Sequence, residues 1–153
     1  MKKLVAVAMT LALVLTILLA HTASTAPDPQ VLVGTWQGEI STQGGRPWSS
    51  RSSRERTLTI RSVEQDGSGE WLVDAQYGVT GGGRSGKIDA KLKVGDSIQI
   101  QFLEPWGAGS GRSAEIKAGL SKEPPWILKG TLTSTDIFLL ELRKVEKNTS
   151  KVN

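Results

Sequence analysis

Apolar and polar residues alternate with a period of two through most of the chain after Pro27. This alternation is typical of β-strands that bury one face and expose the other. The clearest example is "KIDAKLKV", in which every second residue from Ile88 to Val94 is apolar and lysine or aspartate fills the positions between them. No segment after Pro27 has the 3.6-residue period of a helix. The pattern predicts an all-β protein.

Runs of this kind recur along the chain and are separated by turn residues. The eight predicted strands are 32–40, 56–63, 70–78, 87–94, 97–103, 113–120, 126–132 and 137–145. Short antiparallel strands with one solvated face favour a sheet closed on itself, because closure removes exposed edges. We therefore predict a single antiparallel up-and-down eight-stranded β-barrel. A β-sandwich is the alternative, since its strand count and spacing would look the same.

The first 26 residues have the composition of a secretory signal peptide. Lys2 and Lys3 precede an uninterrupted apolar run from Leu4 to Ala20, and small polar residues follow it. The alternative is an uncleaved membrane anchor, because the run is at the short end of the ~17–25 residues that span a bilayer. We expect a secreted or periplasmic protein, bacterial in character, that touches a membrane only if the signal is not processed. The predicted domains are 1–26 signal peptide, 27–147 β-barrel and 148–153 disordered tail.

The composition excludes several classes of function. The chain has no cysteine, and its one histidine, His21, lies in the signal segment. Removing the signal also lowers the formal net charge from +4 to +2, with the charges scattered through the strands. We therefore expect no disulfide, metal site, cofactor or nucleic-acid partner, and no His- or Cys-based catalysis. Asp74, Asp89 and Glu115 fall on the polar faces of their strands, so a catalytic carboxylate pair inside the barrel is not expected. The sequence leaves open whether the rim acids Glu55 and Glu104 approach each other as such a pair. We expect a protein that is not an enzyme.

The segment "GGGRSGK", Gly81 to Lys87, partly matches a phosphate-binding loop. Such a loop needs Ser or Thr after the lysine and a helix behind it, so that the helix N-terminus faces the phosphates. Here Ile88 follows and the strand pattern resumes. We predict a hairpin loop in place of a nucleotide site.

An up-and-down barrel places alternate connections at the same end. The expected loops 41–55, 78–86, 104–112 and 133–136 would share one rim, and three of them are long and rich in glycine. These three carry the candidate ligand-binding residues Arg46, Trp48, Arg51, Arg84, Trp106 and Arg112, with Arg54 beside them. Arginine offers a planar fork to a carboxylate or phosphate, and tryptophan a flat surface to a sugar ring or an acyl chain. The alternative is that these residues only solubilise and anchor their own loops.

"GTW" on the first strand, with Arg143 on the last, resembles the calycin superfamily, which contains lipocalins and avidins. The resemblance implies that Trp36 closes one end of the barrel, that Gly34 lets the backbone turn closely around it, and that Arg143 packs over the indole. It also implies a binding protein, although the polar residues with which avidins contact biotin are not found.

Two functions follow from these observations. The first is a secreted or periplasmic lipocalin-like binding protein for a small amphipathic, anionic or saccharide ligand at the open barrel end. The alternative is a protein-interaction or envelope accessory β-barrel that has an envelope protein as partner and no small-molecule ligand.

Overall fold

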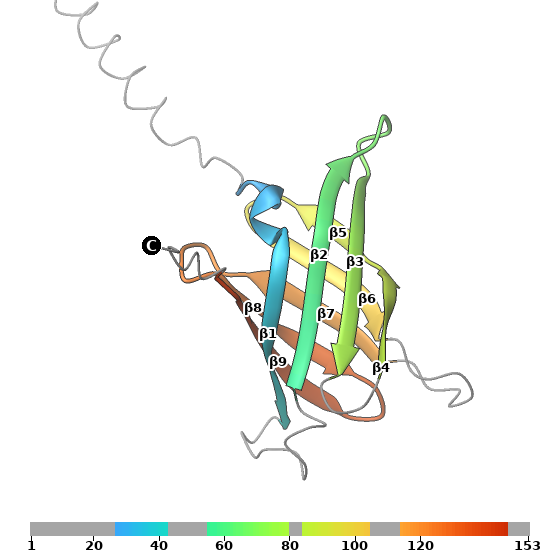
Figure 1. Cartoon of the computed structure of the whole chain (residues 1–153), viewed down its shortest axis with the longest axis vertical. Helices are drawn as coiled ribbons and strands as arrows, with labels where there is room; N and C mark the ends of the chain where they lie inside the picture. Colours follow the sequence, from blue (N-terminus) through green and yellow to red (C-terminus); the bar gives the residue numbers. More distant parts are fainter. Residues whose placement is uncertain (1–26, 43–54, 80–83, 105–113, 147–153) are drawn as a thin grey trace, which may run out of the picture.

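The computed structural model describes residues 27–42, 55–79, 84–104 and 114–146, which form one antiparallel sheet rolled into a barrel (Figure 1). A short 3-10 helix precedes nine strands in this part of the chain. The elements are η1 (Pro29–Leu32), β1 (Gly34–Thr42), β2 (Glu55–Gln65), β3 (Trp71–Val79), β4 (Arg84–Asp89), β5 (Lys91–Val94), β6 (Ile98–Glu104), β7 (Ala114–Leu120), β8 (Ile127–Thr133) and β9 (Ile137–Lys144). The predicted all-β class is confirmed. The predicted signal segment 1–26 and the tail from 148 lie outside the described residues.

The strands follow one another around the barrel as an up-and-down meander. Their order is β4-β3-β2-β1-β9-β8-β7-β6-β5, with antiparallel pairing between neighbours. The first and last strands pair with each other, so that Trp36 lies opposite Lys144 and Thr42 opposite Phe138. This closing ladder confirms the predicted up-and-down barrel and disfavours the sandwich.

The ninth strand arises because the predicted strand 87–94 is divided at Ala90. Its first part, β4, pairs with β3 as far as Asp74 opposite Asp89. Its second part, β5, pairs with β6. One continuous stretch thus exchanges partners and joins the two margins of the sheet. Beyond Ala90, no ladder connects β3 with β5 in the described chain, so the wall of the barrel has a seam there.

One end of the barrel is closed by η1 and Trp36. The Trp36 side chain is fully buried, and its indole Nε1 donates a 2.8 Å hydrogen bond to the carbonyl oxygen of Leu32, the last residue of η1. Gly34 begins β1 with φ +136°, a conformation that L side chains rarely adopt. The predicted role of Trp36 as a closing side chain therefore fits its position.

The cation over Trp36 is Lys144, and the expectation that Arg143 packs there is wrong. Lys144 Nζ lies 5.7 Å from the centroid of the indole and donates a hydrogen bond to the carbonyl oxygen of Val31. Arg143 is exposed on the outer face of β9. Side chains alternate between the two faces of a strand. Because Leu142 is buried and faces inward, Lys144 faces inward as well, and Arg143 between them faces outward.

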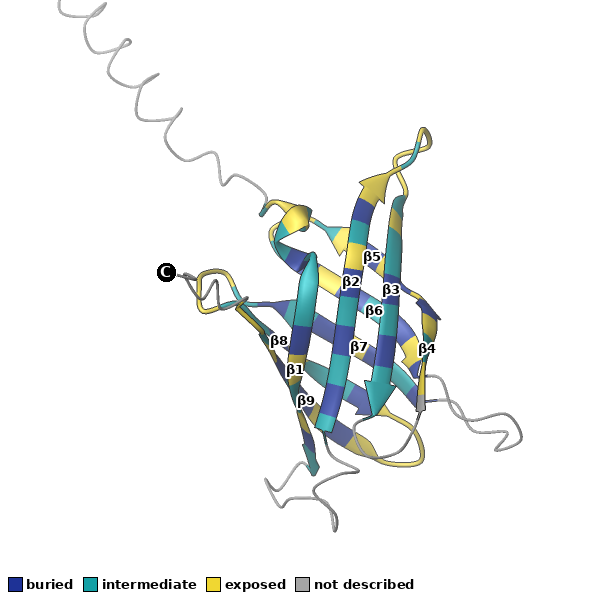
Figure 2. Cartoon of the chain, in the orientation of Figure 1, coloured by how far each residue is buried: buried dark blue, intermediate teal, exposed yellow. Residues whose placement is uncertain are grey.

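Apolar side chains from all nine strands fill the barrel, as the dark bands of Figure 2 show. Trp71 and Trp126 are partly buried and pack against this core. Gly130 allows β7 and β8 to approach closely, because a Cβ atom there would fall on the backbone carbonyl oxygen of Lys117. Gly38 allows the same close approach between β1 and β9, where a Cβ would meet the carbonyl oxygen of Glu141.

The opposite end is where the long connections leave the barrel. β1, β3 and β6 run toward it, and β2, β4 and β7 start from it. The intervening segments 43–54 and 80–83 are shorter than the expected loops 41–55 and 78–86, because β2 begins at Glu55 and β4 at Arg84. The third segment, 105–113, has the length of the expected loop 104–112 and is shifted by one residue, because β6 continues to Glu104 and β7 begins at Ala114. We call this end the mouth. The segment "GGGRSGK" ends within β4, and the absence of a following helix agrees with the rejected phosphate loop.

Candidate functional site

A buried ion pair crosses the interior of the barrel at the mouth. Arg56 is the second residue of β2, Glu104 is the last residue of β6, and Arg56 Nε lies 2.9 Å from Glu104 Oε1. The two residues are only 6% and 5% exposed. They are the buried charged residues among those that the structure describes, so they set the polarity of this layer of the barrel.

Strand periodicity explains why both charges point inward. On β2, Arg56 shares the buried face with Leu58 and Ile60, and on β6 Glu104 follows Ile100 and Phe102 at every second position. Packing of these apolar neighbours fixes which face of each strand points into the barrel. Arg56 and Glu104 lie on that face, so their side chains point inward. Arg56 Nη1 also donates a 3.3 Å hydrogen bond to the carbonyl oxygen of Glu55.

Tyr77 adds a hydroxyl group to this layer. It lies on β3 opposite Leu58, is fully buried, and packs edge-on against Phe102 with ring centroids 5.1 Å apart. Its hydroxyl has no hydrogen-bond partner of adequate geometry among the described residues. Burial, followed by the negative charge of Glu104, raises the pKa of the Tyr77 phenol well above its ordinary value, while the nearby Arg56 acts in the opposite direction.

We call Arg56, Glu104 and Tyr77 the mouth triad. A buried guanidinium presents N–H donors in a fixed plane, a carboxylate accepts hydrogen bonds, and a phenol does both. An ion pair in an apolar interior must overcome the loss of hydration of both charges, so it is poor evidence of a stability gain. Its physical consequence is a polar, charge-bearing layer directly above an apolar interior.

Sequence reasoning did not identify this triad as a site. The sequence pattern indicates Glu104 only as a rim acid next to Glu55, and Arg56 only as the first residue of a strand. The missed signal was the alternation itself, because Arg56 and Glu104 have the same parity as the apolar residues that follow or precede them. Asp89, which was expected on the polar face, does lie on the exposed side.

The predicted rim residues are mostly untested. Arg46, Trp48, Arg51, Arg54, Trp106 and Arg112 lie outside the described residues. Arg84 is the first residue of β4, opposite Val79 at the mouth, and only its backbone is described. The strands that bear these connections do end around the mouth triad.

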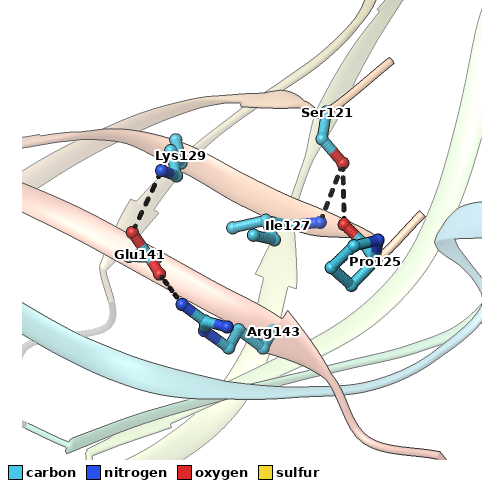
Figure 3. A network of polar contacts seen from close by, with 6 residues as sticks. All are labelled: Ser121, Pro125, Ile127, Lys129, Glu141 and Arg143. Carbon is cyan, nitrogen blue, oxygen red and sulfur yellow. Dashed lines mark hydrogen bonds and ion pairs between the residues drawn. The ribbon is translucent and has the colours of Figure 1, made fainter. Parts of the chain in front are cut away.

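The polar contacts on the outer wall are of a different kind. Glu141 links Lys129, at 3.3 Å, to Arg143, at 2.8 Å, and all three lie on the surface of β8 and β9 (Figure 3). The neighbouring Arg143, and then Lys129, hold the pKa of Glu141 below its ordinary value. Nearby, Ser121 Oγ accepts a hydrogen bond from the Ile127 amide and organises the β7–β8 turn. These contacts order the outer wall and the β7–β8 turn.

Neither metal-binding clusters nor membrane-spanning helices are found in the described ranges. No group of three or more His, Cys, Asp or Glu side chains there could hold a metal ion. No helix there is long and apolar enough to cross a bilayer. Comparisons of the chain with protein-family models, with curated proteins and with solved structures find no match.

Proposed function

We propose that this protein is a secreted or periplasmic, lipocalin-like binding protein, and that it binds a small amphipathic or anionic ligand at the mouth of the barrel. The observation that carries the proposal is the mouth triad, in which a buried Arg56–Glu104 pair and the Tyr77 hydroxyl form a polar layer over an apolar interior. A protein whose only task is to present its outer wall has no need of charges inside.

The chemistry of the triad favours a ligand with an acidic head. A carboxylate or phosphate can accept hydrogen bonds from the Arg56 guanidinium and from the Tyr77 hydroxyl at the same time. Glu104 then shares Arg56 with the ligand, which limits the gain in affinity and favours heads that accept more than one hydrogen bond. The Arg- and Trp-bearing connections that leave the same end would supply a second layer of contacts. The proposal assigns no catalytic step to the triad.

Matched ligands that differ only in the head test this proposal. Laurate and dodecanol have the same apolar chain, and their binding can be followed by quenching of the five tryptophans. We expect laurate to bind at least about tenfold more tightly than dodecanol to the wild type, because a hydrogen bond to a charged group contributes about 1.5–3 kcal/mol. In Arg56→Met the preference should disappear.

Two controls keep the result interpretable. Arg61→Met removes an arginine of the same strand whose side chain is 56% exposed, and it should leave the preference unchanged. Circular dichroism shows whether Arg56→Met keeps the barrel. If neither amphiphile, nor a dodecyl phosphate, quenches the tryptophans of the folded wild type, the binding proposal is wrong. Recovery of an envelope protein partner would then favour the accessory-barrel alternative.

A further inference from the structure

The ion pair of the mouth triad is electrically balanced before any ligand binds. Arg56 and Glu104 carry opposite charges, their nearest charged atoms are 2.9 Å apart, and the two residues are 6% and 5% exposed. No other charged residue among those that the structure describes is buried. An anionic head that binds at Arg56 therefore adds a negative charge that this layer does not compensate, and an apolar interior strongly disfavours such a charge.

The strands around Glu104 bring no further charge into this layer. β4, β5 and β7 contribute the buried side chains of Ile88, Leu92, Ala114 and Ile116, and β1, β8 and β9 contribute Ile40, Leu132, Phe138 and Leu140. Glu55 precedes Arg56 on β2 and lies on the opposite face of the strand. Lys144 faces inward, but at the closed end, over Trp36. Within the part of the chain that the structure describes, an incoming head thus meets Arg56 and Glu104 as its charged neighbours.

Tyr77 contributes a neutral hydrogen-bond donor to the layer. Its hydroxyl is buried and has no hydrogen-bond partner of adequate geometry among the described residues. Because burial raises the pKa of this phenol well above its ordinary value, Tyr77 keeps its proton at neutral pH. The hydroxyl can donate a hydrogen bond to an acidic head, but it cannot cancel the charge of that head. A proton that restores the balance must come from the solvent.

Two carboxyl groups at one guanidinium can hold one proton between them. Glu104 Oε1 already accepts a hydrogen bond from Arg56 Nε, so a carboxylate head on the same guanidinium lies beside Glu104. Two carboxylates that share an apolar site do not both stay ionised, and one of them takes up a proton. The shared proton leaves a single negative charge next to Arg56. The guanidinium can therefore still bind the head while the layer stays neutral.

We propose that the mouth triad binds an acidic amphiphile together with one proton from the solvent, and that Glu104 is the residue that imposes this requirement. The proton is shared between the Glu104 carboxylate and the head, while Arg56 and the Tyr77 hydroxyl donate hydrogen bonds to the head. The inference rests on the proposed function, because it concerns the same ligand at the same site. It narrows the ligand to heads that can be held in a protonated state, and it makes binding weaker as the pH rises.

The test follows the dissociation constant of laurate by tryptophan quenching between pH 6 and 8, where free laurate is ionised. Uptake of one proton makes this constant rise about tenfold per pH unit. Dodecanamide has the shape of the protonated acid and needs no proton, so its dissociation constant should not change with pH. Calorimetric titration of the wild type in two buffers with different heats of ionisation should give about one proton per bound laurate.

Glu104→Gln keeps the shape of the side chain and an oxygen that can accept from Arg56, but it removes the negative charge. Laurate should bind this variant with a dissociation constant that is independent of pH, and at pH 8 at least about tenfold more tightly than the wild type. Glu115→Gln is the matched control, because Glu115 lies on the outer face of β7 and pairs with Lys117. It should keep the pH dependence of the wild type. Circular dichroism shows whether each variant keeps the barrel.

The outcomes separate this inference from the proposed function. If laurate binds the wild type equally at pH 6 and pH 8, with no proton taken up, another cation neutralises the head and only this inference is wrong. A folded Glu104→Gln variant that keeps the pH dependence would also overturn it, because the proton would then reside elsewhere. If neither laurate nor dodecanamide binds the wild type, the proposed function fails and this inference fails with it. The calorimetric result on the wild type decides the matter even if Glu104→Gln does not fold.

Discussion

Truncating one member of the Arg56–Glu104 pair should destabilise the barrel far more than replacing both. Both side chains are almost completely buried, and their charged atoms are 2.9 Å apart. Arg56→Met removes the guanidinium that lies 2.9 Å from the buried Glu104 carboxylate, which costs about 3–5 kcal/mol, and Glu104→Leu has a similar cost. Replacing both residues by apolar ones leaves no buried charge, and the result ranges from no change to a gain of about 1–4 kcal/mol. The single changes are therefore expected to be strongly non-additive.

Urea unfolding followed by tryptophan emission measures these differences. If the free energy of unfolding falls by about 1.5 kcal/mol per molar urea, each single change should lower the urea midpoint of unfolding by about 2–3 M. The double change should restore the wild-type midpoint. Arg61→Met is the matched control on β2, because Arg61 and Asp74 form an exposed pair at 3.6 Å whose contribution should stay below about 1 kcal/mol. If Arg56→Met costs less than about 1 kcal/mol, or if the double variant loses the sum of the two single effects, the interior at the mouth is hydrated and the reasoning is refuted.

Two further predictions concern the closed end and the single tyrosine. Lys144→Met should lower the free energy of unfolding by about 1–2 kcal/mol, because it removes a cation over the Trp36 ring and a hydrogen bond to Val31. Arg143→Met is the control and should change this free energy by less than about 0.5 kcal/mol. Equal effects of the two changes in urea unfolding would contradict the assignment of Lys144 as the cation over Trp36. Tyr77 is the only tyrosine, so any phenolate absorbance near 295 nm, above the tryptophan background, comes from its ionisation. Because burial raises its pKa in the folded state, the protein holds that proton above pH ~10 while the unfolded chain releases it, and stability should fall as pH rises beyond that value. Phenolate absorbance should appear together with unfolding, and a phenol that titrates near pH ~10 in the folded protein would show that Tyr77 is accessible to water.

Most of the barrel could be predicted because a strand that buries one face has an apolar residue at every second position. This alternation does not indicate which strand is the hydrogen-bonding partner. "KIDAKLKV" keeps its alternation through Ala90, although the chain changes from β3 to β6 as neighbour at that point. The seam therefore became visible only in three dimensions.

The candidate site was harder to predict because residue type and position gave opposing signals. The calycin resemblance points to the guanidinium of Arg143, although the parity of the strand favours Lys144. The sequence analysis places Arg56 at the start of a strand and Glu104 in a rim loop, although their parity places both inside. Charged residues at inward positions are rare because of the cost of desolvation, and this rarity makes them informative when they occur.

The central claim, that the mouth triad binds the acidic head of an amphipathic ligand, is tested most directly at the Arg56 side chain. The Nε–H resonance of Arg56 should be observable by NMR, because the group is buried and hydrogen-bonded to Glu104. We predict that laurate shifts this resonance in a saturable manner, and that dodecanol at the same occupancy does so much less. A resonance that stays unchanged while laurate binds elsewhere, or equal shifts with both amphiphiles, would contradict the account.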